Sequence, residues 1–516
     1  MATSSQVIGA SILFAIYGML ILYFVVKGSR GTKNIKDYAL GSIIFSPVFV
    51  ALSLASAMTS AATFVINPGL IANYGLSAYL SFGVVFPLAS MTSLVILTKS
   101  FRKHGQAMNA VSLSSWIGKR YESKGYALFI AFLTFLLITF IVLILVALVK
   151  VVAQALNANQ IWVLGLIIAF IFGYMMFGGA NSMVYTNTIQ AIVMILVAII
   201  LIGSGIQFFR GGLIGFFEKL RVIDPVLVKS TNPQSPLFRD LFEIIFVQIV
   251  VGAAVVVQPH IITKSLLLKK ESDVNKFLTV AVIVQILFYS VVLVGLFARI
   301  KFPDLQQNGV SLNVDGVIPA YVIEVFSGGI GSLLVGLLVI MGLISAGFST
   351  IEGVIQSLST TITSDIIQPL FGKKIREEKY VNINRLVIVV LGIISFFLTR
   401  DQILNPKLSV AIFAQNGVYS YFSILFVPIV FGIFVKNVKL IAPLSGSITA
   451  LVVYFTIYYG FPALLKSGLA NFGYANIYLS DTVQNPAIAA AMAIIASLVV
   501  AITVHWTTKK ANTQSA

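Results

Sequence analysis

A run of polar residues interrupts one of the most hydrophobic stretches of the chain. Between Gly329 and Asp365 the sequence carries Ser345-Ala346-Gly347-Phe348-Ser349-Thr350, followed by Glu352. Hydroxyls, carbonyls and a carboxylate within a bilayer-spanning segment are energetically costly unless they face a partner or a water-filled path. A small cation is the simplest such partner, because hard cations prefer oxygen ligands. The segment therefore predicts a cation site and favours an ion-coupled carrier.

The composition of the 516-residue chain is that of a membrane protein. Hydrophobic residues make up 58% of it, charged residues only 10%, and the mean hydropathy is +1.00. A soluble protein would have about a quarter charged residues. Crossing about 30 Å of hydrocarbon takes about 20 apolar residues, and stretches of this kind recur along the whole sequence. We expect an all-α polytopic membrane protein that forms a single transporter domain over residues 1–516.

About thirteen segments are long and apolar enough to cross a bilayer as helices. They cover residues 6–27, 43–71, 76–99, 125–156, 160–178, 184–208, 238–262, 275–299, 329–363, 383–400, 408–434, 439–460 and 486–506. An odd number of crossings places the two termini on opposite sides of the membrane.

The distribution of Lys and Arg predicts which side is cytoplasmic, because these residues collect in inner loops. With the N-terminus outside, the inner loops receive most of the basic residues, in the ranges 27–36, 99–124, 264–276, 373–385 and 436–439. The formal net charge of +17 is then mainly a topology signal. We expect a multi-pass protein of the cell membrane with an external N-terminus, a cytoplasmic C-terminus and a lipid environment.

Several functional classes find no support in the sequence. The chain has no cysteine, and His104, His260 and His505 lie too far apart to give a metal-ligand spacing. The Walker motif GxxxxGK[ST] and the hydrolase motifs GxSxG and HExxH are absent. The basic residues are scattered over loops and form no continuous face for nucleic acid. We therefore expect no enzyme, no organic cofactor and no nucleic-acid partner.

Two of the predicted helices carry proline at corresponding places. Segment 43–71 contains Ile66-Asn67-Pro68-Gly69, and segment 238–262, five crossings later and reversed in direction, contains Gln258-Pro259-His260. Transporters built from inverted repeats place substrates and ions at such discontinuous helices. Proline-induced kinks without functional meaning are the alternative, but the matched placement favours a pair of broken helices.

Four sequence motifs resemble those of the sodium/solute symporter family, whose members carry proline, pantothenate, sugars and short monocarboxylates. The run from Ala55 to Gly69 (ASAMTSAATFVINPG) is similar to the first core helix of that family. Gln258-Pro259-His260-Ile261-Ile262 with Lys264 resembles its QPHI-x-x-R segment, with Lys264 expected in an inner loop. The other two are Ala346–Thr350 continued to Ser364-Asp365, and Phe434–Asn437 continued to Gly446.

The resemblance implies a LeuT-like core of two five-helix inverted repeats. These repeats would span 43–208 and 238–434, with peripheral helices at 6–27 and within 439–506. It further implies sodium-coupled symport of a small polar organic solute, of the amino acid, vitamin or monocarboxylate class, by alternating access. A proton-coupled or uncoupled carrier on the same fold is the alternative. The sequence leaves the solute and the oligomeric state open.

The resemblance also implies a position for the coupling Na⁺. Backbone oxygens of the first core helix fall on Ser56 and Thr59. The carbonyl of Ala346 and the hydroxyls of Ser349 and Thr350 would complete the site, since hydroxyl and carbonyl oxygens both offer lone pairs. Alternatively, Ser349 and Thr350 bond back to their own helix or pack against a neighbouring one.

Residues that contact the solute are predicted less sharply. Candidate substrate-binding residues are Thr63, Phe64, Gln258 and Gln415, and candidate outer-gate residues are Tyr419, Tyr421 and Phe422. Buried amides bind carboxylate, hydroxyl or amide groups alike, so they do not identify the solute. For Gln415 and its neighbour Asn416, hydrogen bonding between helices is the alternative role.

Two charged or polar positions depart from a simple pattern. The family commonly has Thr-Asp-x-x-Gln in its fifth core helix, whereas this chain has Thr186-Asn187-Thr188-Ile189-Gln190. Asn187 would thus lie on the ion path without a charge, and Glu352 would compensate for it or carry a proton. Lys150, within an apolar segment, would snorkel outward, bind an anionic solute or pair with Glu243.

Overall fold

The computed structural model is nearly all-helical. It describes the chain apart from residues 1–3, 109, 269, 372–375, 377–378, 406–409, 481–483 and 515–516. The longer helices are α1 (Ser4–Ser29), α3 (Pro47–Met58), α6 (Phe86–Ala107), α8 (Lys124–Leu133), α9 (Ile138–Leu156), α10 (Gln160–Met175), α11 (Ala180–Gly203), α12 (Gly212–Ile223), α15 (Asp273–Ser290), α18 (Gly329–Thr361), α20 (Tyr380–Leu404), α21 (Val410–Phe434), α22 (Ile441–Phe455) and α25 (Pro486–Gln514).

Short helices connect or extend these. They are α2 (Ile35–Leu40), α4 (Asn67–Tyr74), α5 (Leu76–Tyr79), α7 (Leu113–Arg120), α13 (Gln248–Val255), α14 (Pro259–Ile262), α16 (Val294–Lys301), α17 (Val317–Val325), α19 (Gln368–Phe371), α23 (Phe461–Lys466) and α24 (Asn476–Leu479). A two-residue antiparallel hairpin, β1 (Gln306–Gln307) and β2 (Val310–Ser311), lies in the loop between α16 and α17.

Helices lie at all thirteen of the expected segments within the described residues, and up to twelve of them qualify as membrane spans. Over the described part of the chain, ten helices are long and apolar enough to cross a membrane, and two further spans are bent helix pairs. The remaining segment is α10, an apolar helix of 16 residues. Residues 408 and 409 of one expected segment lie outside the described residues.

Both bent spans contain a helix end buried within the protein. Pro47–Met58 and Ala62–Tyr74 meet at 56°, and Phe242–Val255 and Pro259–Leu267 meet at 58°. The second break is where Gln258-Pro259 predicted it, because Pro259 cannot continue the preceding helix and begins the next one.

The first break was predicted at the wrong residues. It lies at Thr59–Ala61, before Pro68, which is accommodated at the start of α4. Helix α3 ends at Met58 because the Thr59 backbone is extended (φ −102°, ψ 94°). The Ser60 hydroxyl then accepts a hydrogen bond from the Ala62 backbone N–H (3.1 Å), which caps the following helix.

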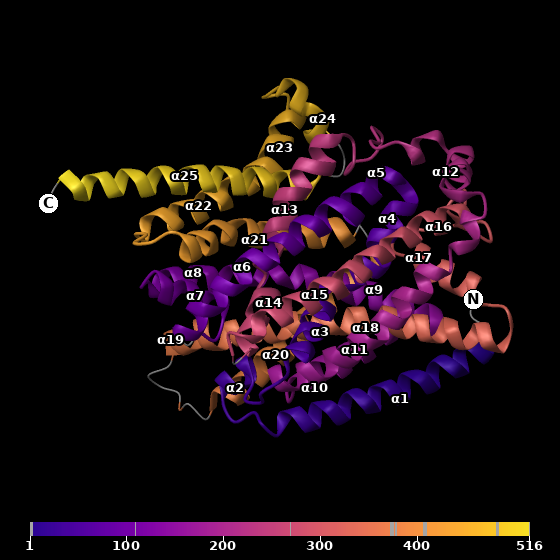
Figure 1. Ribbon diagram of the computed structural model, residues 1–516, viewed down its shortest axis with the longest axis horizontal. Helices are drawn as coiled ribbons and strands as arrows, with labels where there is room; N and C mark the ends of the chain where they lie inside the picture. Colours follow the sequence, from indigo (N-terminus) through magenta and orange to yellow (C-terminus); the bar gives the residue numbers. More distant parts are fainter. Residues whose placement is uncertain are drawn as a thin grey trace.

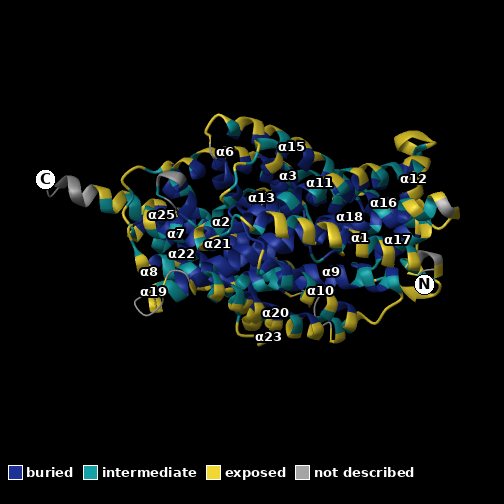
Figure 2. Ribbon diagram, turned by 90° about the horizontal axis from the view of Figure 1, so that it is seen from below, coloured by how far each residue is buried: buried dark blue, intermediate teal, exposed yellow. Residues whose placement is uncertain are grey.

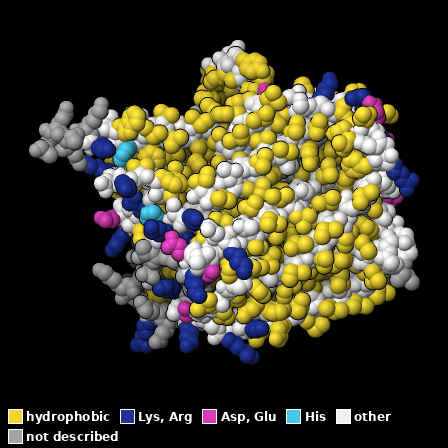
Figure 3. Space-filling model, viewed as in Figure 1, with side chains coloured by type: hydrophobic (Ala, Val, Ile, Leu, Met, Phe, Trp, Pro, Cys, Tyr) yellow, Lys and Arg dark blue, Asp and Glu magenta, His cyan; other side chains and the backbone are white. Residues whose placement is uncertain are grey.

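The long helices run roughly along the longest axis of the molecule, and the termini lie at opposite ends (Figures 1 and 2). Figure 2 places α3, α9, α13 and α18 among the most buried elements. Figure 3 shows apolar side chains over most of one face, with Lys and Arg gathered toward the end that carries the C-terminus. This separation is the one expected for a cytoplasmic C-terminus. Lys269, Lys373 and Lys374, which belong to the predicted inner loops, lie outside the described residues.

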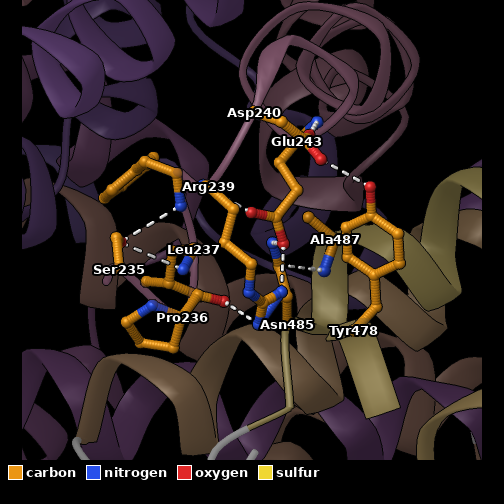
Figure 4. Close-up of polar contacts among 10 residues, drawn as sticks. Ser235, Pro236, Leu237, Arg239, Asp240, Glu243, Tyr478, Asn485 and Ala487 are labelled. Carbon is orange, nitrogen blue, oxygen red and sulfur yellow. Dashed lines mark hydrogen bonds and ion pairs between the residues drawn. The ribbon is translucent and has the colours of Figure 1, made fainter. Parts of the chain in front are cut away.

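A buried ion pair anchors the C-terminal elements to the second bent span (Figure 4). Arg239 Nη1 lies 2.8 Å from Glu243 Oε1, and Asn485, just before α25, donates to the same carboxylate at 3.0 Å. Tyr478 of α24 donates to Asp240 at 2.5 Å. Burial and this carboxylate raise the pKa of Tyr478, so the phenol stays a neutral donor.

The pairing proposed between Lys150 and Glu243 is therefore wrong, because Glu243 is held by Arg239 and Asn485. Lys150 of α9 instead forms an ion pair with Asp315, in the loop that follows the β-hairpin. Its side chain is partly exposed and is not among the residues that line the central cavity described below. The ion pair joins this loop to a helix of the core.

The same loop packs on the second helix of the first bent span at a glycine. A Cβ on Gly69 of α4 would lie 1.8 Å from the Val314 carbonyl oxygen, a distance that no side chain can adopt without moving the backbone. Gly165 of α10 is a matched control, because a Cβ there meets no atom within 4 Å.

We expect Gly69→Ala to lower the free energy of unfolding by about 1–3 kcal/mol, through displacement of the loop. Gly165→Ala should leave it unchanged or raise it, because alanine is the better helix former, by about 0.5–1 kcal/mol. Thermal unfolding of the detergent-solubilised variants measures both. Equal stability of the two variants would contradict the packing described for Val314.

Candidate functional site

The end of α3 and the middle of α18 meet through hydroxyl–carbonyl contacts. Ser349 Oγ donates to the Ser56 carbonyl oxygen at 2.8 Å, and Thr350 Oγ1 donates to the Ala57 carbonyl oxygen at 3.0 Å. Both hydroxyls also lie near the Ala346 carbonyl oxygen, at 3.2 and 3.3 Å. All five residues are fully buried. We call this group, Ser56, Ala57, Ala346, Ser349 and Thr350, the oxygen cluster.

The helix break explains why these oxygens are available. The last carbonyls of a helix have no N–H partner within it, and α3 ends at Met58 in the protein interior. Ser56 and Ala57 therefore present acceptors that need a partner from elsewhere. The hydroxyls of α18 supply one, while their oxygen lone pairs stay available to a cation. The cluster has the donor set that a small hard cation such as Na⁺ prefers.

The structure brings together four of the five predicted ion-site residues by side-chain or carbonyl contacts. Thr59 lies at the break itself, and its hydroxyl turns away to donate to Gln285 Oε1 of α15 at 2.6 Å. Its carbonyl oxygen, the atom that the family resemblance implies, remains a prediction. The Ala57 carbonyl was missed because no side chain distinguishes that residue in the sequence.

A cavity of about 100 Å³ lies between the two helix breaks and α21. This volume holds several water molecules or a small solute. Thr63, Gln258, Gln415 and Tyr419 line it, as predicted for substrate-binding and gating residues, and the cavity has no charged residue among its described lining. Neighbouring Asn416 instead hydrogen-bonds to Tyr454 of α22 and to Tyr459 just beyond it. Of these two neighbours, Asn416 therefore has the alternative role of hydrogen bonding between helices, and Gln415 lines the cavity.

Three other predicted residues lie outside the cavity lining. Phe64 is buried against Phe288, with ring centroids 5.8 Å apart. Tyr421 and Phe422 are buried within the packing of α21. Phe422 contacts Tyr419 (5.0 Å between centroids), and so supports a cavity residue without touching the cavity.

His260 is a cavity residue that the sequence did not single out as a contact. It lies beside Gln258 in the second break, and both side chains are 2% exposed. Gln258 Oε1 and His260 Nδ1 have no hydrogen-bond partner within the described chain. Buried polar atoms are normally paired, so these two atoms are suited to bind a solute that carries hydrogen-bonding groups. Position next to Pro259 was the only signal in the sequence.

Glu352 lies one helical turn beyond the oxygen cluster and is fully enclosed by donors. Tyr174 Oη and Thr186 Oγ1 each donate to its carboxylate at 2.6 Å, and Gln190 Nε2 donates at 3.0 Å. The Asn187 amide can satisfy its neighbours in only one orientation, in which its nitrogen faces acceptors and its oxygen faces a donor. In that orientation Asn187 Nδ2 donates to Glu352 Oε2 at 3.1 Å.

The Asn187 amide oxygen in the same orientation lies 3.1 Å from Lys264 Nζ. Lys264 also donates to Ser53 Oγ of α3 at 2.8 Å and is 4% exposed. The expectation that Lys264 is an inner-loop charge is therefore wrong. It belongs to η7 (Thr263–Leu267), within the second bent span, and the predicted segment ended two residues too early to include it.

Comparisons with known proteins identify the family of the chain. Residues 38–450 match the model of the sodium:solute symporter family. The chain is 26% identical to the sodium/pantothenate symporter of Escherichia coli (strain K12) over 482 residues, covering 89% of this chain and 93% of that protein. It is 23% identical to the high-affinity proline transporter of Bacillus subtilis (strain 168), covering 83% and 87% of the two chains.

A solved structure shares the fold. It is a substrate-bound, outward-open state of a Na⁺-coupled sialic acid symporter, with a TM-score of 0.74 at 18% identity. The match covers 96% of this chain and 97% of that one. The expected LeuT-like architecture is thereby confirmed. The boundaries of the two repeats, 43–208 and 238–434, remain a prediction that the matching bends support.

We expect Ser349→Ala and Thr350→Ala each to raise the sodium concentration for half-maximal stabilisation about tenfold, because each removes one oxygen that can contact a charged group. Ser423→Ala is the matched control, since among the described residues that buried hydroxyl bonds to the Ser420 carbonyl of its own helix and to no other group. Thermal shift of the purified proteins across a sodium series measures the effect. An unchanged sodium dependence in folded Ser349 and Thr350 variants would remove the assignment.

Proposed function

Because the chain belongs to the sodium:solute symporter family, we propose that it is a secondary active transporter that couples Na⁺ entry to uptake of a small polar organic solute. The observation that carries the proposal is the oxygen cluster, in which α18 hydroxyls meet free carbonyls of the interrupted α3. Sodium would bind there, with the Thr59 carbonyl completing the site. Asn187 and Glu352 would lie on the ion path.

The solute would occupy the cavity beside the cluster. Gln258, His260, Gln415 and Thr63 offer amide, imidazole and hydroxyl groups, while aliphatic and aromatic side chains line most of the remainder. This lining suits a solute with an apolar body and a few hydrogen-bonding groups. Pantothenate and proline, which the relatives carry, combine these features, and an amino acid, a vitamin or a short monocarboxylate is the class we propose.

The mechanism is alternating access around this fixed site. Sodium bound between α3 and α18 would hold the first broken helix in place and shape the cavity. Solute binding would then permit rocking of one bundle against the other, with release on the cytoplasmic side. The ion drives uptake only by the difference between its affinities for the two states. An inward-negative potential adds about 2.3 kcal/mol per charge for each 100 mV.

The proposed placement is the cell membrane, with the N-terminus outside and the C-terminus in the cytoplasm. The opposite positions of the two termini and the basic end near α25 support it (Figures 1 and 3).

Uptake into proteoliposomes under an imposed sodium or pH gradient distinguishes sodium coupling from proton coupling. We expect uptake to follow an inward sodium gradient at constant pH, since the site offers neutral oxygens suited to Na⁺. A pH gradient without sodium should drive no accumulation. Accumulation driven by the pH gradient alone would favour the proton-coupled alternative.

The solute can be identified by ligand-induced stabilisation. We expect one class among amino acids, vitamins, sugars and short carboxylates to raise the melting temperature, and to do so more strongly with Na⁺ present than with K⁺. A ligand at 100 times its Kd stabilises the folded state by about 2.7 kcal/mol. A solute that stabilises the protein equally in both salts would contradict coupling at the binding step.

A further inference from the structure

Two opposite charges are buried beside the oxygen cluster. Glu352 of α18 is fully buried and Lys264 of η7 is 4% exposed. A buried charge is costly unless an opposite charge and hydrogen bonds compensate for it. The Asn187 amide bridges the two, with its nitrogen 3.1 Å from Glu352 Oε2 and its oxygen 3.1 Å from Lys264 Nζ. Each charge is therefore the counter-charge of the other.

Both charges adjoin the helices that form the cluster. Glu352 follows Thr350 by two residues in α18. Lys264 Nζ donates to Ser53 Oγ, one helical turn before Ala57 in α3. The bridge itself is tied to the same place, because Ser56 Oγ donates to the Asn187 backbone carbonyl at 3.0 Å. Charges this close to the cluster interact with a bound cation more strongly than they would in water, since the effective dielectric constant of the protein interior is lower.

We propose that Glu352 and Lys264, joined through Asn187, are a charge-balanced pair that sets how tightly the oxygen cluster holds its cation. The inference rests on the proposed function and deepens it. With both charges present they nearly cancel, and the neutral oxygens decide the affinity. Without the carboxylate, the Lys264 ammonium repels the cation. Without the ammonium, the Glu352 carboxylate attracts it and delays its release.

This arrangement predicts effects of opposite sign for the two partners. A purely structural role predicts the same sign, because removing either partner of a buried pair weakens the fold around the site. The sodium concentration for half-maximal stabilisation therefore distinguishes the proposed electrostatic role from a purely structural one. It is measured by thermal shift on each purified protein, and turnover is measured separately in proteoliposomes.

We expect Glu352→Gln to raise the half-maximal sodium concentration about tenfold and Lys264→Met to lower it about tenfold, as one uncompensated charge in the interior would do. Lys264→Met should also slow turnover, because the cation leaves more slowly. The double variant Glu352→Gln/Lys264→Met should return the sodium dependence close to that of the unaltered protein. Glu324→Gln, which removes an exposed carboxylate beside Lys301, is the control and should change nothing.

Moving the carboxylate provides a second test that keeps Lys264 paired. In Asn187→Asp/Glu352→Gln the acid and the amide exchange places, and the aspartate contacts the ammonium directly. We expect this variant to recover the sodium dependence lost in Glu352→Gln. The same double variant tests the inference if Glu352→Gln alone does not fold. In that case we expect Asn187→Asp/Glu352→Gln to have a higher melting temperature than Glu352→Gln.

Shifts of the same sign in Glu352→Gln and Lys264→Met would overturn the inference, as would failure of both paired variants to recover. In either case the proposed function would stand, provided that sodium stabilises the unaltered protein. Absence of any sodium effect on the unaltered protein would overturn the proposed function and this inference with it.

Discussion

The structure depends on a helix that stops inside the protein. Helix α3 ends at Met58 within the bundle, and the Ser56 and Ala57 carbonyls of its last turn have no backbone N–H partner among the described residues. Unpaired backbone groups are not tolerated in such surroundings. The hydroxyls of Ser349 and Thr350 meet this requirement. The pairing joins segments almost 300 residues apart and creates a cluster of oxygens where a cation is the natural third partner.

The surroundings of the cluster follow from the same constraint. The second break, at Gln258-Pro259, opens the cavity on one side, and the turn after it carries Lys264 inward to α3. A buried ammonium requires a carboxylate nearby, and Glu352 fills this role through Asn187. The motif position where relatives commonly have aspartate is an amide in this chain, and the carboxylate comes from another helix. The cavity, the oxygen cluster and the charge pair thus lie next to one another at the two interrupted helices.

Close packing at a glycine and two ion pairs attach the surrounding elements to the core. The loop after the β-hairpin packs its Val314 carbonyl on Gly69 of α4 and attaches to α9 through Asp315 and Lys150. A separate buried pair, Arg239 and Glu243, ties the second bent span to α24 and α25 (Figure 4). These contacts link the peripheral elements to the two broken helices.

The sequence by itself determined the class, the thirteen helical segments, the oxygen-bearing face of α18 and the second break, because apolar length, hydroxyl spacing and proline act locally. It could not determine the first break, since Thr59 and Ser60 end α3 through backbone conformation and not through a breaking residue. Nor could it find the Ala57 carbonyl, the partner of Lys150 or the burial of Lys264. Backbone atoms carry no identity in a sequence, and the partner of a charge depends on which distant helix packs beside it.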